Sequence, residues 1–87
     1  MNYQITYHNV AFRELRKLDR QVRDRIEEAI GKLAFNPRPP GCKKLVASDS
    51  WRIRIGDWRV IYEIMDNEVR ILIVRIGHRR DIYESRA

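Results

Sequence analysis

The sequence has little cysteine, glycine or proline, and each shortage excludes a class of protein. Cys42 is the single cysteine among 87 residues, so an internal disulfide is impossible and a reducing cytoplasm is the expected compartment. It also lies outside any spacing typical of a metal site. Four glycines and three prolines are too few for a low-complexity chain. The composition therefore indicates a globular cytoplasmic protein and suggests neither a metal nor a cofactor.

Long hydrophobic runs are missing as well. The apolar stretches are a few residues long, far short of the about 20 residues needed to span a membrane. The segment from Met1 to Val10 contains Asn, Gln, Tyr and His rather than the basic start and apolar run of a signal peptide. We therefore expect no membrane association. A chain of this length predicts one domain over residues 1–87.

Basic residues are abundant. Lys and Arg total 18 against 12 Asp and Glu, which gives a net charge of +6. Such a balance favours polyanionic partners, with nucleic acid as the first candidate and an acidic protein as the second. Many of these residues fall on the outer faces of the expected helices, where a solvated charged surface is the alternative interpretation.

The first third of the chain predicts one strand and a helical hairpin. Tyr3 to Tyr7 is rich in β-forming residues. Asn9 is the expected N-cap of a helix from Val10 to Leu18, and Asp19 is expected to cap a second helix. The apolar residues of the second helix recur at helical spacing, at Val22, Ile26, Ala29, Ile30 and Leu33. A proline-rich connector over residues 36–41 then ends the helical region.

The remainder of the chain predicts strands. A brief strand is expected from Lys43 to Ala47, and from Trp51 onward the pattern has a period of two. Gly56-Asp57 sits where a two-residue hairpin turn would fall. The register set by this turn pairs residue 54 with 59 and residue 52 with 61. It places three arginines on one face, namely Arg52, Arg54 and Arg59.

A second turn is expected at Asp66-Asn67, which would pair Tyr62 with Ile71 and Glu63 with Arg70. The apolar face of this sheet would then carry Ile53, Ile55, Trp58, Val60, Tyr62, Ile64, Val69, Ile71 and Ile73. The arginine face would also carry Ile61, Leu72, Val74 and Ile76. The predicted fold class is α+β, with an N-terminal strand and a helical hairpin packed on an antiparallel β-sheet.

The arginine face predicts an anion site. Neighbouring guanidinium groups repel one another unless an anion lies between them, and phosphate accepts paired, charge-assisted hydrogen bonds from arginine. The chain then delivers His78, Arg79, Arg80 and Tyr83 after the last strand. Histidine exchanges protons near neutral pH, and tyrosine offers a phenol and a stacking surface. The alternative is a solvated sheet edge with its arginines directed outward.

RNA supplies its own nucleophile, the ribose 2′-hydroxyl beside the phosphate. A site without metal needs a group that deprotonates this hydroxyl, arginines that stabilise charge on phosphorus, and an acid for the leaving 5′-oxygen. The residues near the arginine face therefore fit metal-independent RNA cleavage better than hydrolysis by activated water.

Two segments carry a family resemblance, Trp51-Arg-Ile-Arg-Ile-Gly-Asp-Trp-Arg59 and Ile73-Val-Arg-Ile-Gly-His-Arg-Arg-Asp-Ile-Tyr83. Together with the order of elements, they resemble the RelE/ParE superfamily of bacterial and archaeal toxins, and the RelE branch in particular. The resemblance implies a ribosome-dependent endoribonuclease, or mRNA interferase, of a type II toxin-antitoxin system. Such an enzyme cuts messenger RNA in the ribosomal A site, leaves a 2′,3′-cyclic phosphate and thereby inhibits translation.

The resemblance also implies partners and roles. The partners are a RelB-like antitoxin and the ribosome with bound messenger RNA, with a toxin-antitoxin hetero-oligomer that binds DNA through the antitoxin. The catalytic positions of the family fall on Arg52, Arg54, Arg59, Arg79 and Tyr83, and His78 is added to them as a titratable residue of the same segment. Lys44 and Arg80 are expected to bind RNA, and no residue is expected to hold a metal.

RelE enzymes carry lysines where this chain has Arg52 and Arg54. Because arginine effectively keeps its proton, these residues are expected to bind phosphate, and the general base becomes His78 or Tyr83. One alternative is a ParE-like toxin that inhibits DNA gyrase through protein contacts without nuclease activity. Another is an inactive relative that acts only as a binding partner.

Overall fold

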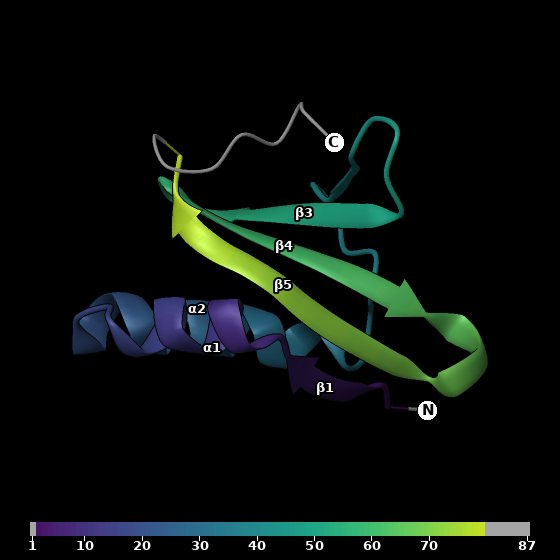
Figure 1. Cartoon of the computed structure of the whole chain (residues 1–87), viewed down its shortest axis with the longest axis horizontal. Coiled ribbons are helices and arrows are strands. Elements are labelled where there is room, and N and C mark those ends of the chain that lie inside the picture. The colour runs from purple at the N-terminus through teal and green to yellow at the C-terminus, as the bar shows by residue number, and fades with distance from the viewer. Residues whose placement is uncertain (1, 80–87) are drawn as a thin grey trace.

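The computed structural model describes residues 2–79, so the predictions for Arg80 and Tyr83 lie outside the described residues. One helical layer covers one side of a sheet (Figure 1). The sheet has five strands in the order β1-β5-β4-β3-β2. In chain order the elements are β1 (Gln4–Tyr7), α1 (Asn9–Arg16), α2 (Arg20–Leu33), β2 (Lys43–Lys44), β3 (Ser50–Ile55), β4 (Trp58–Met65), a 3-10 turn (Asp66–Glu68) and β5 (Arg70–His78). No helix within residues 2–79 is long and apolar enough to cross a membrane.

The helical hairpin forms as predicted, with one difference at its start. The Asp19 carboxylate accepts a hydrogen bond from the Val22 N–H at 3.0 Å, which confirms it as the N-cap of α2. The first helix is capped by His8 instead of Asn9, because Nδ1 of the extended His8 accepts from the Val10 N–H at 3.2 Å. The helix also ends at Arg16 rather than Leu18.

The predicted α+β class is confirmed, and the sheet is mixed. β1 pairs in parallel with β5, from Gln4 opposite Arg70 to Tyr7 opposite Ile73, whereas the other neighbouring strands are antiparallel. At the opposite edge, β2 stops at Lys44 and does not reach Ala47, whose φ of 55° belongs to the following turn.

The β3–β4 hairpin has the predicted register. Ile55 lies opposite Trp58, Arg54 opposite Arg59 and Arg52 opposite Ile61. The turn between these strands contains Gly56 with φ 61°, a conformation that glycine adopts without the steric cost of a Cβ.

The β4–β5 register differs from the prediction by two residues. The turn contains the 3-10 segment Asp66–Glu68 and Val69 in the left-handed conformation, so Tyr62 pairs with Ile73 and not with Ile71. The predicted Glu63–Arg70 pair is therefore wrong. Glu63 lies opposite Leu72, and Arg70 contacts the Glu68 carboxylate at 2.7 Å.

A β-bulge further along the same pair exchanges the faces of β5. Tyr62 pairs with Ile73 and Ile61 with Arg75, so Val74 is the extra residue. Glu14 of α1 holds the strand beyond the bulge, since its carboxylate accepts from the Ile76 N–H at 2.8 Å and from the Arg75 guanidinium at 3.0 Å. Ile76 consequently belongs to the core and not, as predicted, to the arginine face.

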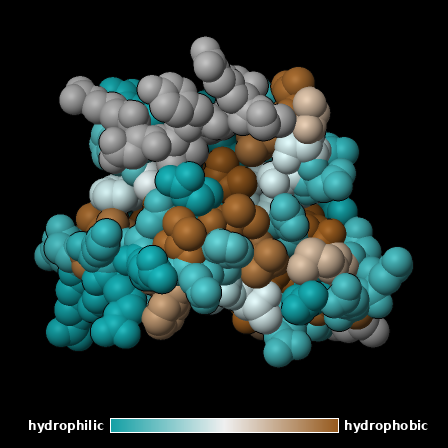
Figure 2. All heavy atoms as spheres, in the orientation of Figure 1, coloured by the Kyte–Doolittle hydropathy of each residue, from teal (hydrophilic) through white to brown (hydrophobic). Residues whose placement is uncertain are grey.

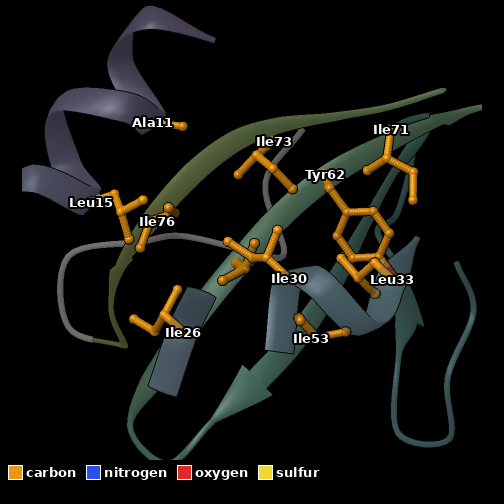
Figure 3. Packing of buried hydrophobic residues seen from close by; sticks show 11 residues of the cluster. Ala11, Leu15, Ile26, Ile30, Leu33, Ile53, Tyr62, Ile71, Ile73 and Ile76 are labelled. Carbon is orange, nitrogen blue, oxygen red and sulfur yellow. The ribbon is translucent and has the colours of Figure 1, made fainter. Parts of the chain in front are cut away.

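The core lies between the helical layer and the sheet. In Figure 3, Ile30 and Leu33 of α2 lie toward Tyr62 of the sheet, and Ile26 lies at the end of the cluster that holds Leu15 and Ile76. The buried hydrophobic cluster contains Ala11, Leu15, Ile26, Ile30, Leu33, Ile53, Val60, Tyr62, Ile71, Ile73 and Ile76. Figure 2 shows many hydrophilic residues over the helical layer, and Val10 and Phe12 of α1 are exposed hydrophobic residues among them. One face of each helix therefore packs on the sheet, and the other is largely solvated.

Candidate functional site

Three arginines lie on the face of the sheet that the helices leave uncovered. Arg54 of β3 is directly opposite Arg59 of β4, and Arg52 is two residues before Arg54 on the same strand. Because alternate strand residues point to opposite faces, the burial of Ile53 and Val60 against the helices places these three side chains on the other face. We call this surface the arginine face.

The three arginines differ in exposure. Arg52 is 5% exposed and lies opposite Ile61, which is also buried. Arg54 is exposed, and Arg59 is half-buried. Arg54 and Arg59 are therefore the members of this set that a ligand reaches most directly.

The end of β5 adds a fourth guanidinium beside the β3–β4 turn. The Arg79 N–H donates to the Asp57 carbonyl at 2.8 Å, and Arg79 Nε is 3.9 Å from the Asp57 carboxylate. Gly77 lies opposite Arg59, so strand alternation puts Arg79 on the arginine face. The glycine also leaves no side chain beside Arg59 on this face.

His78 lies on the other side of the sheet. It pairs with Trp58, which packs against the core, and the two ring centroids are 5.5 Å apart in an edge contact. Its Nε2 is 4.0 Å from the Asp57 carboxylate. The structure thus brings Arg52, Arg54, Arg59 and Arg79 to one face and places His78 on the helix-covered face. Arg80 and Tyr83 lie outside the described residues.

The short strand β2 places a different lysine on the arginine face from the one predicted. Lys44 lies opposite Trp51, which packs toward the core, whereas Lys43 lies opposite Arg52. Both lysines are exposed. Lys43 was missed because its position depends on the pairing of a two-residue strand. Lys43 can be identified from the alternation along β3, because the residue that pairs with Arg52 lies on the same face as Arg52.

Several groups with shifted pKa values lie at the other end of β4. The Tyr3 hydroxyl donates to Asp66 at 2.7 Å and the Arg38 guanidinium donates to it at 3.0 Å. These hydrogen bonds lower the pKa of Asp66 and raise the pKa values of Tyr3 and Arg38. Arg38 also stacks over Trp51, with 5.1 Å between its guanidinium carbon and the ring centroid.

Tyr62 makes a further contact between the sheet and the proline connector. Its hydroxyl donates to the Pro37 carbonyl at 2.7 Å, and burial raises the pKa of Tyr62 well above its ordinary value. The contacts of Tyr62, Arg38 and Asp66 fasten the proline connector to the sheet. We therefore assign them to the fold and not to the arginine face. Within residues 2–79, no three His, Cys, Asp or Glu side chains gather in an arrangement that could hold a metal ion.

The fold and the arginine face define a small α+β protein with a basic sheet surface on the side away from the helices. Residues 5–83 match the family described as the ParE toxin of the type II toxin-antitoxin system parDE. The chain therefore belongs to this toxin family, and the resemblance to the RelE/ParE superfamily is confirmed.

Relatives carry RelE names. The toxin RelG of Mycobacterium tuberculosis is 31% identical over 85 residues, which cover 95% of this chain and 98% of that protein. The mRNA interferase toxin RelE of Escherichia coli is 25% identical over 81 residues, with 91% and 85% covered. The archaeal RelE–RelB complex from Pyrococcus horikoshii contains a chain that is 28% identical, with a TM-score of 0.80 and coverage of 91% of this chain and 97% of that one.

Proposed function

We propose that this RelE-like toxin is a ribosome-dependent endoribonuclease that cleaves messenger RNA without a metal and so inhibits translation. The observation that carries the proposal is the pairing of Arg54 with Arg59, with Arg52 and Arg79 on the same face. Arginines at such spacing can clamp a phosphate through charge-assisted hydrogen bonds. The printed name of the Escherichia coli relative, an mRNA interferase, also supports it.

In the proposed reaction the ribose 2′-oxygen forms a bond to phosphorus while the bond to the 5′-oxygen breaks. The 2′-hydroxyl loses its proton, the 5′-oxygen gains one, and a 2′,3′-cyclic phosphate remains on the upstream fragment. Arg54 and Arg59 bind the phosphate and stabilise its developing negative charge. Arg79 adds positive charge from the end of β5. The buried Arg52, two residues before Arg54 on β3, adds a further positive charge beside this cluster.

Arginine retains its proton, so the proton carrier is a different group. His78 is on the helix-covered face, against Trp58. We therefore assign proton transfer to Tyr83, and leave His78 the role of packing at the sheet end. Lys44 and Arg80 are proposed to bind RNA phosphates away from the reacting bond, and Lys43 joins them because it lies opposite Arg52.

The proposed partners follow from the same relatives. The solved complexes of RelE with RelB support a RelB-like antitoxin for this chain, in a hetero-oligomer that binds DNA through the antitoxin. The exposed basic residues of α1 and α2 are proposed to contact ribosomal RNA phosphates. Action on the ribosome requires a cytoplasmic protein.

Primer-extension mapping of messenger RNA after induced expression tests the proposal. We expect cuts within translated codons that disappear when translation is blocked. A ParE-like toxin is the alternative, favoured by the name of the matching family. It predicts intact messages and trapped complexes of gyrase with broken DNA, and this result would overturn the nuclease assignment.

A further inference from the structure

The parallel pairing of β1 with β5 stops before β5 ends. β1 ends at Tyr7 opposite Ile73, and the His8 N–H donates to the Ile73 carbonyl at 2.9 Å. β5 continues through the bulge at Val74 and ends at His78. Within residues 2–79, the last part of β5 therefore has β4 on one side and no strand on the other.

Glu14 of α1 supplies hydrogen bonds to this edge where β1 has ended. Its carboxylate accepts from the Ile76 N–H at 2.8 Å, and from Arg75 Nε and Nη2 at 3.1 and 3.0 Å. The Glu14 side chain is 23% exposed and Ile76 is 1% exposed. Because a buried N–H without a partner costs free energy, the bond from Glu14 stabilises the observed position of this segment.

The segment that Glu14 holds leads directly to Arg79. The bonded amide of Ile76 is three residues before Arg79, whose own N–H donates to the Asp57 carbonyl at 2.8 Å beside the β3–β4 turn. A bulge interrupts the regular hydrogen bonding of a strand pair. The strand beyond it therefore depends on other contacts for its position, and Glu14 makes such a contact.

We propose that Glu14 is a positioning residue for the RNA-cleaving site, because it holds the end of β5 in the pairing that directs Arg79 to the arginine face. This role rests on the proposed function, in which Arg79 stabilises negative charge on the reacting phosphate. Glu14 belongs to the helical layer and acts through the backbone of Ile76, not by contact with the RNA. Its loss should leave the fold formed and release the end of β5.

Hydrogen exchange of the isotope-labelled full-length chain tests the structural step. Glu14→Ala should speed exchange of the Ile76 and Arg79 amides by about tenfold or more, because the segment loses the contact that fixes it. The Tyr3 amide donates to the Ala34 carbonyl at 2.8 Å and is the internal reference, with an expected change below about twofold. Unchanged exchange of the first two amides, or equal acceleration of all three, would overturn the proposal.

The conservative variant Glu14→Gln isolates the backbone bond. Glutamine keeps a side-chain oxygen that can accept from the Ile76 N–H, but it loses the charge that pairs with Arg75. Since the Arg75 side chain is 46% exposed, it can bond to water instead. Exchange of the Ile76 amide should therefore stay within about threefold of the parent. A loss as large as that of Glu14→Ala would contradict a role through the backbone.

Single-turnover cleavage on programmed ribosomes tests the functional step. Glu14→Ala should slow cleavage by about tenfold or more, whereas its addition to Arg79→Ala should cost less than about threefold, because the guanidinium that Glu14 positions is already absent. A full further tenfold loss in the double variant would mean that Glu14 acts on the fold as a whole. Glu28→Ala removes an exposed carboxylate from α2, and as the matched control it should leave cleavage within about twofold.

The two measurements separate this inference from the proposed function. If the parent chain does not cleave messenger RNA, the proposed function fails, and hydrogen exchange alone decides whether Glu14 positions Arg79. If the parent cleaves and Arg79→Ala is slow, but Glu14→Ala cleaves like the parent, the proposed function stands and the positioning role is wrong.

Discussion

The two faces of the sheet use alternate residues of the same strands for opposite purposes. On β3, Ile53 packs in the core between Arg52 and Arg54, and on β4 the buried Val60 follows Arg59. The helix-covered face is apolar and closed, whereas the arginine face is charged and adjoins an open groove. Fold and proposed function therefore occupy neighbouring sequence positions. Substitutions one residue apart should affect different properties.

The largest effect on stability is expected on the helix-covered face. Ile73→Ala removes a fully buried side chain from the centre of the core and should lower the free energy of unfolding by about 2–5 kcal/mol. Equilibrium urea denaturation measures this loss. Leu72→Ala, one residue away on the partly exposed face, is the matched control and should cost about 1 kcal/mol. Equal losses would contradict the assignment of the two faces.

On the arginine face the expected loss is in activity. Arg59→Ala and Arg79→Ala should each slow cleavage of ribosome-bound messenger RNA by about 100-fold or more, because each removes a positive charge from the reacting phosphate. Neither variant should be toxic when it is expressed in cells. Melting temperature and antitoxin binding should remain as in the parent chain.

A charge-matched variant separates this effect from general electrostatics. Arg20→Ala removes the same charge from the start of α2, where Arg20 is exposed and 3.8 Å from Asp24. It should keep cleavage within a few-fold of the parent, since screened surface charges contribute little. Full toxicity of the Arg59 and Arg79 variants would contradict the proposed site.

The sequence predicts the arginine face well because its register depends on a local turn. Gly56-Asp57 joins β3 and β4 directly, so the pairing of Arg54 with Arg59 follows from period and turn length. The start of α2 is also predicted from local sequence, because its N-cap Asp19 acts on the next few residues. The parallel pairing of β1 with β5 could not be derived in this way, because it joins residues more than 60 positions apart.

His78 was expected to follow the last strand, but β5 continues to His78 and pairs there with Trp58. The bulge then decides which face His78 shares, because without it Ile76 and His78 would lie on the arginine face. The extra residue Val74 shifts the pairing and turns both side chains toward the helices. A single-residue bulge leaves no strong sequence signal, and here Glu14 of a distant helix holds the backbone beyond it. The same shift places Arg79 on the arginine face.

The smallest effect is expected at His78. His78→Gln keeps a polar side chain against Trp58 while removing the titratable ring, and should leave cleavage within about twofold, because the register directs this side chain away from the arginines. Tyr83→Phe, in contrast, should slow cleavage by about 100-fold or more, the usual contribution of a general acid or base. Single-turnover cleavage on programmed ribosomes measures both. A large loss for His78→Gln with unchanged stability would mean that the end of β5 rearranges on the ribosome and that proton transfer belongs to the histidine.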